Sequence, residues 1–123
     1  MSQRIFTYEQ ASALLDAVRD RTLAANARLR ALREEAGEIR PPSEEAIAER
    51  MDEVVTEWAG EIIAMGALPK GIFTVDFDSG RGFYYCWSLD EQELTHYHGY
   101  DEGFAGRKPL TSDQLAPGRV VLN

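Results

Sequence analysis

Apolar residues recur at alternating spacings of three and four in the first third of the chain, a pattern that predicts an amphipathic helix. The stripe is formed by Leu15, Val18, Thr22, Ala25, Leu29, Leu32 and Ala36. Thr7 and Gln10 have the spacing of a capping box, which marks the start of the helix. Gly37 can adopt the left-handed conformation that ends it. At 1.5 Å per residue, the helix would be roughly 40 Å long.

A second helical pattern follows Ser43, which is a good N-cap residue with acidic residues directly after it. Its apolar face consists of Ile47, Met51, Val54, Val55, Trp58, Ile62 and Met65, and Gly66 ends it. The connection between the two helices is short, so they are expected to lie antiparallel. Residues 1–66 therefore predict a hairpin of two long helices.

The pattern changes to strict alternation in residues 71–98, which predicts β-strands over 72–78, 82–89 and 93–98. A turn with an odd number of residues would place Phe73, Val75 and Phe77 on the same face as Tyr85 and Trp87. If Leu94 opposes Leu89, then His96 lies near Trp87 and His98 near Tyr85. The prediction is an α+β fold in which the N-terminal antiparallel hairpin of long helices packs on a C-terminal three-stranded antiparallel β-meander.

We expect residues 99–123 to form a Gly-rich loop and a tail, for which the sequence leaves three alternatives open. The tail after residue 110 adds an edge strand through residues 119–122, docks as an arm, or is loose. A chain of 123 residues suits one domain with one hydrophobic core. We therefore expect residues 1–123 to form a single domain.

Charge is unevenly distributed along the predicted hairpin. Residues 19–33 contain five arginines and one acid, and residues 44–61 contain seven acids and one arginine. Attraction between antiparallel helices explains this asymmetry better than an anion or nucleic-acid site. The net charge of −8 also argues against a broad nucleic-acid surface. No apolar run is long enough to span a membrane, and the single cysteine indicates a cytoplasmic protein.

His98 and Asp101 are the first candidates for chemistry, as a base oriented by a carboxylate or as a metal-binding pair. A zinc site normally uses more nitrogen or sulfur ligands at a defined spacing. A structural histidine, hydrogen-bonded to Asp101 or Tyr85, is therefore the preferred interpretation. No cofactor is predicted.

Cys86 is a third candidate, but a strand interior offers no helix N-terminus to lower its pKa, so a small buried residue is preferred over a nucleophile. Asp76 interrupts an apolar strand and needs solvent or a cation. Arg107 is its expected partner. Glu91, in the turn at residues 90–92, is the competing partner for Arg107. Alternatively, Arg107 binds the carboxylate or phosphate of a ligand.

Several segments together resemble a known family. They are Phe6-Thr7-Tyr8-Glu9-Gln10-Ala11 near the start, residues 71–77, Tyr85-Cys86-Trp87, Glu91, His98, Asp101 and residues 103–110, which read GFAGRKPL. Over about residues 5–110 the chain resembles an uncharacterised prokaryotic family, domain-of-unknown-function family 2203. It departs from the usual pattern at Asp90, Gln92 and Tyr97, and by two extra residues before Val75. The resemblance implies no particular activity.

These observations favour a non-catalytic binding or protein-interaction module. A homodimer through the hairpin, or another protein partner, is expected because the helices are longer than a three-stranded sheet can cover. The alternative is a small-molecule or metal-dependent enzyme whose site lies near His98, Asp101 and Arg107.

Overall fold

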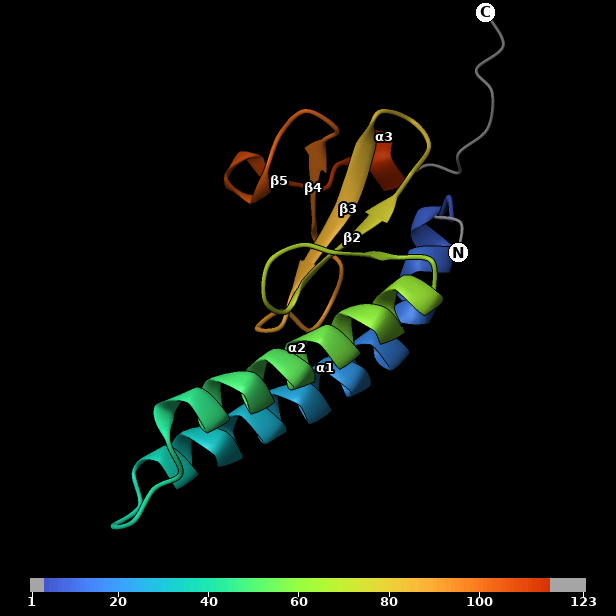
Figure 1. Ribbon diagram of the computed structural model, residues 1–123. Helices are drawn as coiled ribbons and strands as arrows, with labels where there is room; N and C mark the ends of the chain where they lie inside the picture. The colour runs from blue at the N-terminus through green and yellow to red at the C-terminus, as the bar shows by residue number, and fades with distance from the viewer. Residues whose placement is uncertain (1–3, 116–123) are drawn as a thin grey trace, which may run out of the picture.

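The computed structural model describes residues 4–115, in which two long helices precede a five-stranded antiparallel sheet (Figure 1). The helices are α1 (Tyr8–Ala36) and α2 (Glu44–Ala64), followed by β1 (Leu68–Pro69), β2 (Thr74–Asp78), β3 (Phe83–Ser88), β4 (His96–Gly99), the 3₁₀ turn η1 (Phe104–Gly106), β5 (Lys108–Pro109) and the short helix α3 (Ser112–Leu115). The strands lie side by side in chain order. The α+β class is confirmed, whereas the prediction of three strands is wrong.

Both helices begin and end where the sequence predicts. The Thr7 hydroxyl accepts the Gln10 amide and the Gln10 side chain accepts the Thr7 amide, which completes the capping box. At the start of α2 the Ser43 hydroxyl accepts the Ala46 amide, a simple N-cap without the reciprocal side-chain bond. Gly37 follows α1 with a φ of −94°, so this end is not left-handed as expected, whereas Gly66 follows α2 with a φ of +91°.

The two apolar stripes face each other along the hairpin. The predicted α1 stripe is buried from Leu15 to Leu32, and the α2 residues Ile47, Val54, Trp58 and Ile62 are buried against it. Arg21 pairs with Glu61 at 3.1 Å and Arg28 with Glu57 at 2.7 Å. These cross-helix pairs support the view that the charge asymmetry joins the helices.

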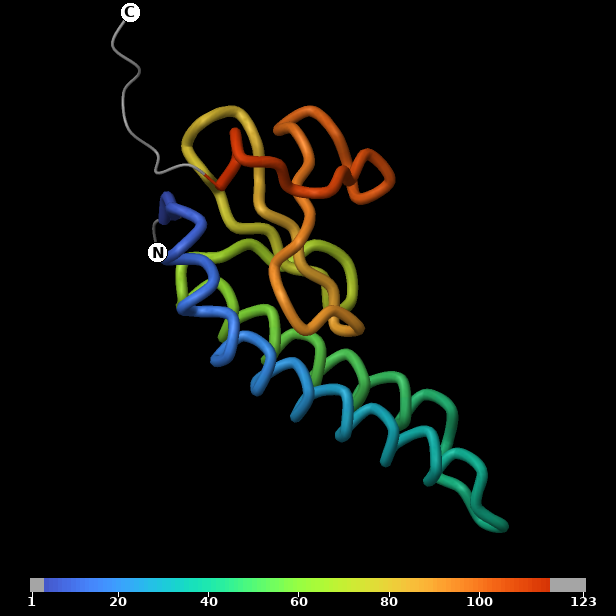
Figure 2. The backbone as a smooth tube through the Cα atoms, turned by 180° about the vertical axis from the view of Figure 1, so that it is seen from behind, coloured from blue at the N-terminus to red at the C-terminus, as the bar shows by residue number. Residues whose placement is uncertain are grey.

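The sheet rests its apolar face on one half of the hairpin, and the other half extends beyond it (Figures 1 and 2). Val75 pairs with Trp87 and Phe77 with Tyr85, which confirms the predicted coincidence of the apolar faces. Edge-to-face aromatic contacts connect the sheet to the N-terminal segment. The ring centres of Phe77 and Phe6 lie 5.4 Å apart, and those of Tyr85 and Tyr8 lie 5.8 Å apart. This is the inner face of the sheet.

The two unpredicted strands lie at the edges of the sheet. β1 pairs Leu68 with Asp76, and β5 pairs Tyr97 with Lys108. Each has only two residues, so neither provides an alternating pattern that sequence could reveal.

The pairing of β3 with β4 differs by one residue from the prediction. His98 lies opposite Tyr84 and His96 opposite Cys86, not next to Tyr85 and Trp87. The shift arises in the connection over residues 89–95, where Glu91 turns back and its carboxylate accepts the Ser88 amide at 2.8 Å. A shift of one residue moves a side chain to the opposite face. Both histidines therefore lie on the outer face, away from the helices.

The end of the described chain returns to the sheet at α3. The Tyr85 hydroxyl donates to the Gln114 carbonyl at 3.1 Å, which docks this segment. The edge strand considered for residues 119–122 lies outside the described residues.

Candidate functional site

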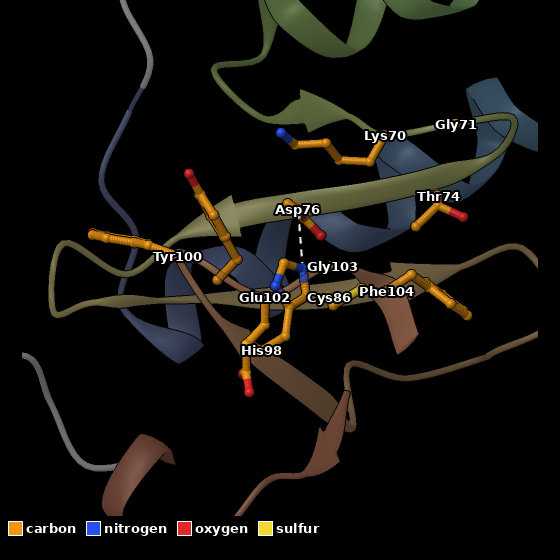
Figure 3. A pocket seen from close by; sticks show the side chains of 11 residues that line it. Lys70, Gly71, Thr74, Asp76, Cys86, His98, Tyr100, Glu102, Gly103 and Phe104 are labelled. Atoms are coloured by element: carbon orange, nitrogen blue, oxygen red, sulfur yellow. Dashed lines mark hydrogen bonds and ion pairs between the residues drawn. The ribbon is translucent and has the colours of Figure 1, made fainter. Parts of the chain in front are cut away.

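Three polar side chains meet on the outer face of the sheet. Asp76 on β2 is paired with Cys86 on β3, and His98 on β4 occupies a position of the same alternation. β2 and β4 are not neighbours, so Asp76 and His98 make contact over the intervening strand β3, beside the Cys86 side chain (Figure 3). The alternation that buries Val75 and Trp87 on the inner face thus directs these three groups outward.

The Asp76–His98 contact is almost completely buried. Nε2 of His98 lies 3.0 Å from Oδ2 of Asp76, and the two side chains are 5% and 2% exposed. Nδ1 of His98 lies 3.0 Å from the Gly99 carbonyl oxygen, which can only accept a hydrogen bond. Nδ1 therefore carries a proton, and Nε2 faces a carboxylate.

The remaining groups of this cluster are the second Asp76 oxygen and the Cys86 thiol. Among the described residues, Asp76 Oδ1 is buried and accepts no hydrogen bond. Ligand atoms of Asp76, Cys86 and His98 all lie within 4.8 Å of one another. Burial, followed by the negative charge of Asp76 and a hydrogen bond from the thiol to the Asp76 carboxylate, raises the pKa of the Cys86 thiol to about 12. The thiol is therefore protonated at neutral pH and is a poor nucleophile.

The cluster forms the floor of a cavity of about 430 Å³. Its other lining residues come from the β1–β2 connection, β2, β3 and the segment after β4 (Figure 3): Lys70, Gly71, Thr74, Tyr84, Tyr100, Glu102, Gly103 and Phe104. Three aromatic rings thus surround a polar floor, an arrangement typical of sites for small organic ligands. We call this the outer pocket.

Hydrogen bonds hold the rim of the outer pocket. The Tyr100 hydroxyl donates to Asp78 at 2.5 Å, and this bond raises the pKa of Tyr100. Glu102 accepts the Gly99 amide at 2.7 Å and Lys108 at 3.0 Å; the amide bond contributes most to lowering the pKa of Glu102. Both contacts connect the loop after β4 back to the sheet.

The rim also contains a lysine that has no acidic partner within residues 4–115. The Lys70 ammonium group lies 5.8 Å from the centre of the Tyr84 ring. No carboxylate of the described residues lies within ion-pair distance of this group. Lys70 is the cation of this pocket that is available to a ligand.

Arg107 belongs to a separate ion pair beside the pocket. Its Nη2 donates to the two Glu91 oxygens at 2.7 and 2.6 Å and to the Cys86 carbonyl at 3.3 Å. The predicted Asp76–Arg107 pair is therefore wrong, and the competing partner Glu91 is correct. The Trp87 indole also donates to the Glu91 carbonyl at 2.7 Å. Arg107 thus joins the β3–β4 turn to the segment before β5.

The sequence candidates therefore separate into three groups. Asp76, Cys86 and His98 come together, Glu91 and Arg107 pair with each other, and Asp101 is exposed in a turn after β4. His98 bonds to neither Asp101 nor Tyr85, because the shifted register turns it away from Tyr85 and toward β2. Lys70, Tyr84, Tyr100 and Phe104 were missed as site residues; of these, only Tyr84 had a usable signal, its place in the alternation of β3.

In the described part of the chain, no helix combines the length and apolarity needed to cross a membrane. No curated protein and no solved structure matches the chain. One family model matches residues 4–110, that of an uncharacterized conserved protein, DUF2203. This match covers nearly all of the helices, the sheet and the outer pocket. The chain therefore belongs to the DUF2203 family.

Proposed function

We propose that this protein is a small-molecule-binding module and that the outer pocket is its ligand site. The observation that carries the proposal is the cavity of about 430 Å³, whose aromatic walls enclose a buried polar floor. Asp76 Oδ1 has no hydrogen-bond partner among the described residues, although an unpaired buried acceptor is costly. A site of this kind gains binding energy from apolar contact and orientation from a few polar groups.

The preferred ligand is a small planar organic anion. Tyr84, Tyr100 and Phe104 offer flat apolar surfaces, and Phe104 is 49% exposed. Lys70 supplies a positive charge that no described carboxylate neutralises. A carboxylate attached to an aromatic ring would satisfy both features. The raised pKa of Cys86 favours binding over thiolate chemistry.

Titration of the metal-free protein with benzoate and nicotinate, followed by amide NMR, tests this proposal. Saturable shifts are expected at the pocket positions Thr74, Cys86 and Gly103, with little response to neutral benzamide. Lys70→Met should weaken benzoate binding about fivefold. This loss corresponds to the roughly 1 kcal/mol that one exposed charge interaction contributes. Arg30→Met, which removes the same charge from an exposed α1 position, is the control. The proposal would be refuted if benzoate caused no saturable shifts, or if Lys70→Met and Arg30→Met bound benzoate equally well.

The alternative class is a small-molecule or metal-dependent enzyme. One observation favours it: the buried His98–Asp76 pair, a hydrogen-bonded base and acid at the floor of a cavity. Asp101 and Arg107 do not line this cavity, so His98 and Asp76 are the catalytic candidates. Chemical change of the added ligand over hours, observed in its own NMR spectrum, would favour this class over a binding module.

A homodimer through the helical hairpin is retained as a proposal. Leu23 on α1 and Ile63 on α2 are 49% and 45% exposed, and the hairpin extends beyond the sheet (Figure 1). Sedimentation at high micromolar concentration tests it, and a strictly monomeric species would contradict it. We also retain the proposals of a cytoplasmic location and of no nucleic-acid partner, supported by the free Cys86 and by the cross-helix pairs of Arg21 and Arg28.

A further inference from the structure

The floor of the outer pocket brings together an oxygen, a sulfur and a nitrogen donor from three strands. Ligand atoms of Asp76, Cys86 and His98 lie within 4.8 Å of one another, and all three residues are buried. Around a tetrahedral ion with bonds of about 2.0–2.3 Å, donor atoms are separated by about 3.3–3.8 Å. Small side-chain adjustments would therefore bring the three donors into coordination distance.

The orientation of the His98 ring suits a metal ligand. The Gly99 carbonyl oxygen 3.0 Å from Nδ1 requires a proton on that nitrogen. Nε2 lies 3.0 Å from Asp76 Oδ2, and its lone pair becomes available to a metal ion once the proton that it shares with Asp76 is lost. A metal-bound histidine commonly donates its other ring N–H to a backbone carbonyl. His98 already has this orientation, with Nε2 directed toward the cluster.

Asp76 adds a second, independent observation. Its side chain is 2% exposed, and its Oδ1 accepts no hydrogen bond from the described residues. A carboxylate with a buried, unpaired oxygen is destabilising unless a cation or a donor is bound there. Cys86 is paired with Asp76 on the adjacent strand, so its sulfur is the third potential metal ligand of the cluster.

We propose that Asp76, Cys86 and His98 bind a divalent transition-metal ion of the zinc class at the floor of the outer pocket. A mixed nitrogen, sulfur and oxygen donor set favours such ions over Mg²⁺ and Ca²⁺, which prefer oxygen alone. On binding, the S–H bond of Cys86 is replaced by a sulfur–metal bond, and the proton passes to the solvent. Three protein ligands leave a fourth position, which faces the cavity. If the outer pocket binds an organic anion, as proposed above, the anionic group of that ligand occupies the fourth coordination position of the metal.

Titration of chelator-treated protein with Co²⁺, with no organic ligand present, tests the metal site. We expect saturable visible absorption typical of tetrahedral Co²⁺, a near-ultraviolet thiolate-to-cobalt band, and displacement of Co²⁺ by Zn²⁺. Cys86→Ser should remove the thiolate band, and His98→Gln should weaken binding by at least about 10–100-fold, the loss typical even of outer-shell changes. His96→Gln is the matched control, because His96 lies on the same strand and face but outside the cluster.

The native protein provides a readout that does not depend on how the variants fold. Binding of Zn²⁺ should shift the His98 Nε2 resonance in ¹⁵N NMR while Nδ1 keeps its proton. No saturable Co²⁺ binding, binding without the thiolate band, or equal affinity in Cys86→Ser and His96→Gln would overturn the metal site.

The two proposals fail separately. Benzoate binding to metal-free protein that does not bind Co²⁺ would support the ligand site and refute the metal site. Cobalt binding by a protein that binds neither benzoate nor nicotinate would do the reverse.

Discussion

Strands β2, β3 and β4 have two faces, and these faces differ in how completely their buried polar atoms are hydrogen-bonded. On the inner face, Trp87 and Tyr85 are buried against the helices, and their polar atoms donate to the backbone carbonyls of Glu91 and Gln114. On the outer face, Asp76 is equally buried, but one of its oxygens lacks a partner among the described residues. Burial alone therefore does not distinguish a core from a site, whereas hydrogen-bond completeness does.

The inner face should respond most strongly to truncation. Trp87→Ala removes a fully buried ring and should lower the free energy of unfolding by about 3–5 kcal/mol. Tyr100→Ala, at the 46% exposed rim of the outer pocket, should cost less than about 1 kcal/mol. Urea denaturation of both variants measures the contrast. Equal losses would mean that the outer rim is as much part of the core as the inner face.

Cys86 should be far less reactive in the native protein than in the unfolded chain. A pKa of about 12, compared with 9.0 for an ordinary thiol, lowers the thiolate fraction at pH 8 about a thousandfold. Iodoacetamide labelling of chelator-treated protein, with and without urea, measures the difference. Because the folded state retains the thiol proton, this group should also reduce stability as pH rises from about 9 toward 12. Native labelling within tenfold of the unfolded rate would contradict the buried thiol.

The Glu91–Arg107 pair allows a smaller test beside the pocket. Arg107→Met should cost about 2–3 kcal/mol, because it leaves the Glu91 carboxylate, 17% exposed, without its charged partner. The added change Glu91→Gln should recover part of the loss. Urea denaturation provides the measurement, and metal affinity should stay nearly unchanged because Arg107 is not a proposed ligand. A large loss of Co²⁺ binding in Arg107→Met would show that this pair and the outer face are not independent.

The hairpin and the inner face were predictable because each follows a local rule. The Thr7 and Ser43 caps, the two stripes and the alternation of β2 and β3 all appear in the structure. The two edge strands were not predictable, because two residues are too few for a period. Their pairing depends on chain segments folding back, which sequence spacing does not specify.

The site was predictable as separate residues and not as a group. Asp76, Cys86 and His98 were all candidates, but each was assigned a different partner or role. The one-residue shift between β3 and β4 decides which face His98 occupies, and it arises in the irregular connection between these strands, which has no period to read. The Asp76–His98 contact joins strands that are not neighbours, so no local pattern encodes it.

The loop that presents Lys70 also contains the one described non-glycine residue with a positive φ, Phe73 at 63°. A residue other than glycine in this conformation costs roughly 1–3 kcal/mol, so surrounding contacts must hold it. The Lys70 amide donates to the Thr74 carbonyl at 2.7 Å, and the Phe73 ring meets the ring of Trp58 on α2 at 5.3 Å. A backbone movement of Lys70 toward a bound ligand would have to be absorbed by this tight turn or by the contact between the Phe73 and Trp58 rings. The helical layer is therefore mechanically connected to the mouth of the cavity on the opposite side of the sheet.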